Sequence, residues 1–212
     1  MTPIAVCIPS IGKSGKMLDD LVNVCRSERR VAHISVYDNS PDGVLPDAIH
    51  RPGQTIYQEF NEFASTWDCR AHMAYLNDDI VMAPGTLDAL AAELDGNEDL
   101  GLVSVDRQET QARVEPRRVR RTQGTVRVGG INSWLFMVKR LCWPIEGIDE
   151  RFQVWFGDDA LIWKIKENGK EAAVLEGVSV EHRHSLTLNT IPGVAELQAA
   201  DADLWHRQMG RP

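Results

Sequence analysis

Continuous apolar runs alternate with helical patterns through the first half of the chain. The run Ile4 to Ile8 has no polar position, which is typical of a strand covered on both faces. Apolar residues from Met17 to Arg29 recur at helical spacing. The same alternation predicts strands at Val31 to Tyr37, Ala71 to Leu76 and Leu100 to Val105, and helices at Tyr57 to Trp67 and from Pro84, at position N1, to Leu94. This order predicts a parallel sheet with helices on both faces.

The pattern changes after residue 106. Gln108 to Gly124 is polar and is expected to form a loop or an excursion. The remaining expected elements are a strand from Ile131 to Val138, a helix from Gly157 to Asn168 that ends at Gly169, strand material within Glu171 to Glu181, and a last helix from about Val194 to Arg207.

Composition limits the classes of protein to consider. The chain has 212 residues, enough for one large domain, and its 43% hydrophobic and 25% charged content is ordinary for a soluble protein. A net charge of -8 argues against a protein that binds nucleic acid mainly through its overall electrostatic field. No apolar run reaches the roughly 20 residues of a membrane span, and the N-terminus reads as a strand and not as a signal peptide. The widely spaced Cys7, Cys25, Cys69 and Cys142 predict buried thiols in a reducing compartment, so we expect a cytoplasmic protein.

Two acidic pairs carry the chemistry. Asp78 and Asp79 follow Asn77 at the end of a predicted strand, whereas Asp158 and Asp159 begin a predicted helix. A strand end and a helix start can meet in one crevice at the edge of an α/β sheet. Carboxylates gathered there can hold a divalent cation and abstract a proton, which suits transfer from a phosphate-bearing donor.

Each pair also has a structural reading. Asp78 and Asp79 can make an Asx turn before the next helix, and one member of the second pair can cap the helix that it begins. Shielding by Trp155, Phe156 and Trp163 would raise the pKa of a carboxylate in the second pair and favour a role as general base. The sequence does not choose between Asp158 and Asp159.

Several short motifs, taken in order, resemble those of one family. They are Ile8-Pro9-Ser10, Tyr37-Asp38-Asn39-Ser40, Leu76-Asn77-Asp78-Asp79, Gly147-Ile148-Asp149-Glu150-Arg151-Phe152 and Trp155-Phe156-Gly157-Asp158-Asp159. Together they resemble the GT-A glycosyltransferases, most of all the inverting, family-two-like enzymes that use nucleotide-sugar donors. The resemblance covers roughly residues 4 to 185. It implies a single Rossmann-like α/β domain with a mixed, mainly parallel sheet.

The resemblance also implies a metal site. Asp79 matches the ligand position of the Asp-X-Asp motif, whereas Asn77 stands at its first position and brings no charge. A histidine after the last core strand completes the metal shell in such enzymes, so His182 or His184 is implied, with His182 preferred. The implied cation is Mn²⁺ or Mg²⁺, bridging the diphosphate of the donor.

A donor site against the first strands is implied in the same way. The matching positions are Pro9, Ser10, Asp38, Asn39, Asn61, Asn77 and Asp78. Pro9 and Ser10 match the loop that touches base and ribose, and Asp38 matches the carboxylate that binds the base. Asp38 is equally well explained as an ordinary turn former.

Two further features have open interpretations. The arginines of residues 113–127 favour a lid over the diphosphate, a docking site for an anionic acceptor, or merely a solvated loop. Trp134, Trp143 and Trp155 can stack on sugar rings or pack in the core.

The resemblance divides the single domain into a nucleotide-binding half at residues 1–106, an acceptor and catalytic half at 107–191, and a C-terminal helix at 192–212. The predicted function is metal-dependent transfer of a sugar from a nucleotide-sugar donor to an acceptor hydroxyl, with inversion and an aspartate base. The acceptor, whether protein, glycan, lipid or small molecule, is left open. A retaining transferase and a non-catalytic nucleotide- or glycan-binding domain are the alternatives.

Overall fold

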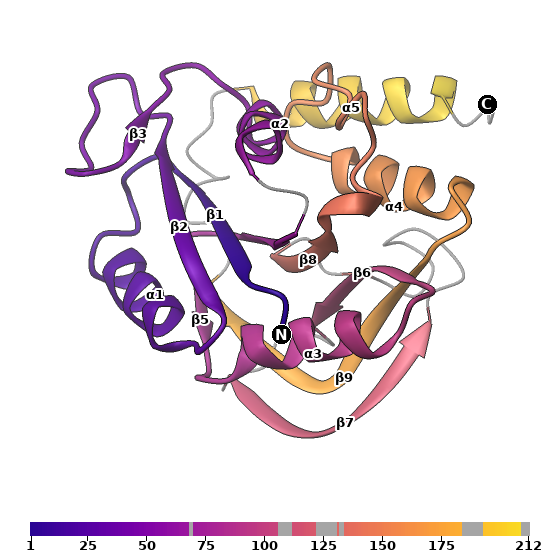
Figure 1. Cartoon of the computed structure of the whole chain (residues 1–212). Helices are drawn as coiled ribbons and strands as arrows, with labels where there is room; N and C mark the ends of the chain where they lie inside the picture. Colours follow the sequence, from indigo (N-terminus) through magenta and orange to yellow (C-terminus); the bar gives the residue numbers. More distant parts are fainter. Residues whose placement is uncertain (68–69, 106–111, 122–130, 132–133, 184–192, 209–212) are drawn as a thin grey trace.

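One mixed sheet organises the chain, and helices pack against both of its faces (Figure 1). The computed structural model describes residues 1–67, 70–105, 112–121, 131, 134–183 and 193–208. The strand order is β3-β2-β1-β4-β8-β6-β9-β5, with β7 paired to β9. The single α/β domain class expected from the sequence is confirmed.

The first strands form a parallel unit. β1, Ile4–Ser10, lies between β2, Val31–Asp38, and β4, His72–Leu76, and is parallel to both. A short strand that the sequence pattern missed, β3 at Ile49–His50, extends this unit beyond β2. Because these strands run the same way, β1 and β4 end at the same edge of the sheet, where the candidate residues follow.

The strands expected in the first half are parallel to one another, and the next strand in space is an antiparallel one from the second half, so the sheet is mixed and mainly parallel as expected. β8, Leu135–Lys139, inserts between β4 and β6, Leu100–Val105, and is antiparallel to both. The pattern of the first half could not show this, because the inserted strand comes from beyond residue 106.

The long strand β9, Glu171–His182, joins the rest of the sheet. It is parallel to β6 and antiparallel to β5, Ile80–Met82, and to β7, Arg113–Arg121. The loop expected at Gln108 to Gly124 is therefore wrong for the part that β7 occupies. Residues 106–111 and 122–130 lie outside the described part.

The helices agree closely with the apolar periodicity. They are α1 at Lys16–Ser27, α2 at Ile56–Thr66, α3 at Thr86–Gly96, α4 at Gly157–Glu167 and α5 at Val194–Gln208, together with a 3-10 turn at Arg140–Cys142. α3 begins after Gly85, whose φ is 88°, so the expectation of Pro84 at position N1 is wrong. Gly169, with φ of 75°, follows the last residues of α4 as expected.

Two apolar clusters fill the space on the two faces of the sheet. Along β1, Ala5 and Cys7 face the cluster that includes residues of α2, α4 and α5, and Ile4, Val6 and Ile8 face the cluster under α1 and α3. This double burial is what the continuous apolar run of β1 predicts. The sheet edge with its candidate residues is thereby fixed between two packed layers.

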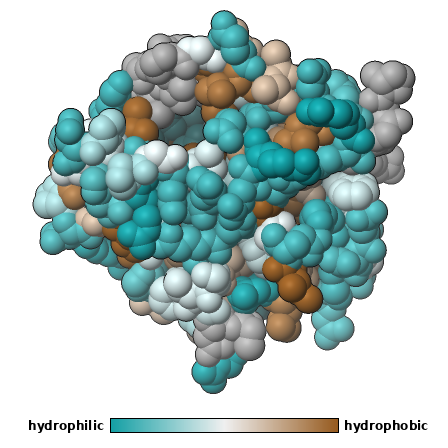
Figure 2. Space-filling view, turned by 90° about the horizontal axis from the view of Figure 1, so that it is seen from above, coloured by the Kyte–Doolittle hydropathy of each residue, from teal (hydrophilic) through white to brown (hydrophobic). Residues whose placement is uncertain are grey.

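The outer surface is mainly hydrophilic, with small hydrophobic patches, on the face that Figure 2 presents. Within the described residues, no helix has the length and apolar character needed to cross a membrane. Cys7 and Cys25 are buried free thiols and Cys142 is half-buried and also free, while Cys69 lies outside the described part.

Candidate functional site

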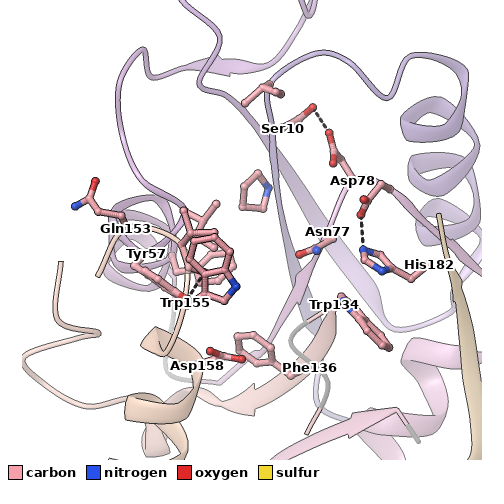
Figure 3. Close-up of a pocket in the computed structure, with 16 residues that line it drawn as sticks. Ser10, Tyr57, Asn77, Asp78, Trp134, Phe136, Gln153, Trp155, Asp158 and His182 are labelled. Atoms are coloured by element: carbon pink, nitrogen blue, oxygen red, sulfur yellow. Dashed lines mark hydrogen bonds and ion pairs between the residues drawn. The ribbon is translucent and has the colours of Figure 1, made fainter. Parts of the chain in front are cut away.

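A cavity of about 320 Å³ opens where β1 and β4 end (Figure 3). Nine of the residues singled out from the sequence line it: Pro9, Ser10, Asn77, Asp78, Asp79, Trp134, Trp155, Asp158 and His182. The other lining residues are Ile11, Ile56, Tyr57, Phe60, Phe136, Gln153 and Val154. Segments separated by more than a hundred residues thus meet in one space.

Asp78 connects the end of β4 to the loop after β1. The Ser10 hydroxyl donates to Asp78 Oδ2 at 2.5 Å, and the Gly12 amide donates to Ser10 Oγ at 3.0 Å. Burial raises the pKa of the Asp78 carboxyl, and the hydrogen bond from Ser10 opposes that shift. Asp78 therefore fixes the loop that forms one wall of the cavity.

Asp79 points to a different partner from its neighbour. Its Oδ1 lies 3.1 Å from Nε2 of His182, and both side chains are buried. The ladder between β5 and β9 places Ile80 opposite His182, which brings the two side chains together. The indole of Trp134 stacks on the His182 ring at 4.8 Å and 19°, which limits the orientation of the imidazole.

The Asp79–His182 pair fits a divalent cation as a partial site. Carboxylate oxygen and imidazole nitrogen suit Mn²⁺, and a carboxylate alone suits Mg²⁺. No group of three or more His, Cys, Asp or Glu side chains gathers for a metal within the described residues. The pair could supply at most two ligands, and oxygen atoms of water or of a bound ligand would complete the shell.

Asp158 and Asp159 lie in the first turn of α4, and both are buried. The N-cap is Phe156, with φ of 66° and no side-chain cap, so the expectation that one aspartate caps the helix is wrong. Only Asp158 lines the cavity. Carboxylates are favoured in this first turn because they face the positive end of the helix dipole.

A wall across from Ser10, Asp78 and His182 is made by Tyr57, Gln153, Trp155 and Asp158 (Figure 3). The Tyr57 hydroxyl donates to the Val154 carbonyl at 2.9 Å. A Cβ on Gly157 would lie 2.4 Å from the Tyr57 ring, so only glycine allows this approach.

Sequence reasoning named Trp155 and Asp158 of that wall and missed Tyr57 and Gln153. Gln153 and Val154 directly precede the quoted motif at Trp155, and this adjacency was the available signal. Tyr57 and Phe60 gave no such signal, because their helical spacing is what core packing requires. Of the three tryptophans considered for sugar stacking, Trp134 and Trp155 line the cavity. Trp143 is buried and stacks on Tyr75 at 5.3 Å.

The remaining candidates lie away from the cavity lining. Asp38 is fully buried and accepts hydrogen bonds from the amides of Ser40 and Leu45 at 2.9 and 2.8 Å. Burial opposes ionisation of Asp38, yet hydrogen bonds from Ser40 and Leu45 bring its pKa below the usual value. Its carboxylate shapes the turn that begins at Asn39. His184 lies outside the described residues.

Asn61 is also used elsewhere. Its amide nitrogen donates to the Ile148 carbonyl and its oxygen accepts from the Ile148 amide, both at 2.8 Å. This reciprocal pair ties α2 to the segment before α4, outside the lining of the cavity.

The geometry supports two kinds of chemistry in one space. A carboxylate and an imidazole stand together on one side, and a second buried carboxylate stands on the other. The first pair can bind a cation that carries a phosphate-bearing ligand, and the second can accept a proton from a hydroxyl.

Several solved structures that match this fold are glycosyltransferases. A mannosyltransferase from Pyrobaculum calidifontis, in complex with GDP-Man and Mn²⁺, matches with a TM-score of 0.63 and 15% identity over 88% of this chain and 58% of its own. Glucosyl-3-phosphoglycerate synthase from Mycobacterium tuberculosis, in complex with Mn²⁺ and UDP-glucose, matches with a TM-score of 0.68 and 14% identity over 100% of this chain and 81% of its own. TarS from S. aureus matches with a TM-score of 0.57 and 12% identity over 83% of this chain and 60% of the TarS chain.

These matches confirm the GT-A fold that the motifs indicated. The chain spans only 60% and 58% of the length of two of these structures. No protein-family model matches the sequence. No curated protein matches it either.

Proposed function

We propose that the chain is a glycosyltransferase that moves a sugar from a nucleotide-sugar donor to an acceptor hydroxyl. One observation carries the proposal: the Asp79–His182 pair and Asp158 line the same cavity, on a fold shared with transferases solved with GDP-Man or UDP-glucose. A donor diphosphate needs neutralising charge, and an acceptor hydroxyl needs a base. The cavity offers ligands for a cation, which would supply the charge, and a carboxylate that would act as the base.

The donor belongs on the side of the cavity formed by the loop after β1. Pro9, Ser10, Asn77 and Asp78 line this side, and Asp78 holds the loop through Ser10. Asp38 and Asn39 then contribute by shaping the neighbouring turn, and Asn61 by tying α2 to the segment before α4.

The metal belongs at Asp79 and His182, with His184 as a further candidate ligand. Mn²⁺ or Mg²⁺ bound there would neutralise the diphosphate and stabilise it as a leaving group. Asn77, next to the pair, would offer its amide oxygen as a hydrogen-bond acceptor. Trp134 keeps the His182 ring in place for this role.

Asp158 is the general base in this proposal. It accepts the proton of the acceptor hydroxyl while that oxygen forms a bond to the anomeric carbon, and the bond from that carbon to the diphosphate oxygen breaks. The electron pair of the broken bond leaves with the nucleotide. This single displacement inverts the anomeric carbon. Asp159, buried behind the cavity lining in the same turn, stays the alternative base.

A non-catalytic nucleotide- or glycan-binding domain is the second candidate. Asn77 in place of an acidic residue favours it, as does a protein site of only two ligands among the described residues. Such a domain would need no base at position 158.

The test compares Asp158→Asn with Asp159→Asn. We expect Asp158→Asn to lower turnover of the nucleotide sugar by roughly 10²-fold or more, because proton transfer contributes about that factor. Donor affinity should persist within a few-fold, since the metal and the donor lie on the other side of the cavity. Asp159→Asn serves as the matched control and should cost less. Full activity of Asp158→Asn, with a large loss in Asp159→Asn, would contradict the assignment and make Asp159 the base. No turnover of any nucleotide sugar by the unaltered protein would favour the binding domain.

A further inference from the structure

A carboxylate on the last helix holds the wall of the cavity that carries Trp155. Asp201 of α5 is 1% exposed. Its Oδ1 accepts from the Gln153 amide, and its Oδ2 accepts from the amides of Val154 and Trp155, each at 2.9 Å. Three consecutive backbone donors thus converge on one side chain from a helix about fifty residues further along the chain.

The same helix supports the next residue in a second way. Phe156 adopts a left-handed conformation, with φ of 66°, which is rare and strained for an aromatic residue. Trp205 of α5 stacks on its ring at 6.0 Å and 15°. The segment 153–156 is therefore fixed from α5 at both of its ends, and only Gly157 separates it from Asp158.

The position of this segment points to the acceptor. Gln153 and Trp155 line the cavity on the side of Asp158, away from Ser10, Asp78 and His182 (Figure 3), and Val154 between them in the chain also lines it. A hydroxyl that gives its proton to Asp158 must lie beside that carboxylate, so the molecule bearing it would contact this segment. The donor side is held by its own contacts, Ser10 with Asp78 and Asp79 with His182, in which α5 takes no part.

We infer that Asp201 is a positioning residue for the acceptor: it holds Gln153, Val154 and Trp155 so that a sugar-like acceptor, stacked on Trp155, presents its hydroxyl to Asp158. The inference rests on the proposed function. Hydrogen bonds from amides to a carboxylate are stronger than those to a neutral oxygen, so this arrangement restrains the segment more than an amide side chain would. Displacement by about 1 Å is enough to lower a transfer rate by roughly 10²-fold.

Asp201→Asn is the informative substitution. It keeps the shape of the side chain but replaces one carboxylate oxygen with an NH₂ group. That group is a hydrogen-bond donor and would face at least one backbone N–H, which is also a donor. Asp203→Asn is the matched control, because Asp203 is exposed on the same helix and only its backbone carbonyl takes part in a described hydrogen bond. Both variants change the net charge equally.

The measurement separates transfer from hydrolysis. With the nucleotide sugar that the protein consumes fastest, one assay follows transfer to a panel of p-nitrophenyl glycosides, and a second follows release of free sugar to water. We expect Asp201→Asn to lower kcat/KM for the best glycoside by about 10-fold or more, mainly through KM. The rate of hydrolysis should change by no more than about twofold, because water does not need to bind against residues 153–155. Asp203→Asn should match the unaltered protein in both assays. Hydrogen exchange at the amides of 153–155 should accelerate in Asp201→Asn alone.

The possible failures are distinct. If transfer and hydrolysis fall together, Asp201 merely supports the fold and the inference is overturned. Equal transfer by Asp201→Asn and Asp203→Asn would overturn it as well. An unaltered protein that consumes no nucleotide sugar and modifies no glycoside would contradict the proposed function itself.

Discussion

At the scale of single residues, neighbouring carboxylates take up different tasks. Asp78 holds a loop through Ser10, and Asp79 pairs with His182. The sequence could predict that this acidic motif lies at a strand end, because the apolar run before it is unmistakable. It could not assign the two side chains, because their partners come from segments about 70 and 100 residues away.

Glu59 is a residue that no sequence pattern indicated. It is fully buried in α2, and neither carboxylate oxygen has a hydrogen-bond partner among the described residues. Burial, reinforced by the charges of Glu62 and Asp38, raises the pKa of Glu59 to about 8, against the opposing charge of Arg51. Its spacing places it on the apolar face of the helix, where a charged residue is not expected.

We expect Glu59→Gln to stabilise the protein in a manner that depends on pH. Below about pH 4.5 the Glu59 carboxyl is protonated in both the folded and the unfolded chain, so the substitution adds little to the free energy of unfolding. As the pH rises towards 8, only the unfolded chain releases the proton, and the original protein loses up to roughly 1.4 kcal/mol for each pH unit. Melting curves between pH 4.5 and 8 should show a gain in Tm that grows to several degrees.

The neighbouring Glu62 supplies the control. Its hydrogen bonds to Arg51 lower the pKa of Glu62, so its contribution to stability is present above pH 4.5 and is lost at lower pH. Glu62→Gln should therefore lower Tm at pH 8 and have less effect near pH 4. A gain for Glu59→Gln that does not vary with pH would contradict the burial of an ionisable group.

At the scale of elements, periodicity located the helices well and failed where partners decide the structure. α1, α2, α4 and α5 lie close to their predicted ranges because each shows an apolar stripe. The arginine-rich strand β7, Arg113–Arg121, has no such stripe. It forms a strand because it pairs with one edge of β9, and because Val114 and Val119 pack against the core. That edge could not be seen from the polar segment itself.

The start of α2 offers a test at this scale. The Thr55 hydroxyl accepts from the Gln58 amide at 3.3 Å, and the Gln58 side chain accepts from the Thr55 amide at 2.9 Å, forming a capping box. We expect Thr55→Ala to lower the free energy of unfolding by about 1 kcal/mol, or about 2–4 °C in Tm. Thr55→Ser keeps the hydroxyl, so its loss of unfolding free energy should be less than half of the loss in Thr55→Ala. Equal losses in the two variants would show that the cap does not stabilise the helix.

At the scale of the whole molecule, the site results from strand order. β1 and β4 end side by side, and β8 inserts between β4 and β6. β9 then brings His182 to Asp79, the residue directly before β5. The motifs could predict the GT-A fold, since their order along the chain is typical of it. They could not predict the wall held by α5, because the three contacts of Asp201 connect a surface helix to a loop without any sequence pattern.

The central claim is that this cavity binds a nucleotide diphosphate together with a metal. The most direct measurement is a thermal-shift series with UDP, GDP, dTDP, CDP and ADP, each with and without Mn²⁺, on the unaltered protein and on Asp79→Ala. A ligand at 100 times its Kd adds about 2.7 kcal/mol to stability. We predict that one nucleotide stabilises the unaltered protein when Mn²⁺ is present, and that Asp79→Ala loses the metal-dependent part. Stabilisation by no nucleotide, or equal stabilisation of Asp79→Ala, would contradict the claim.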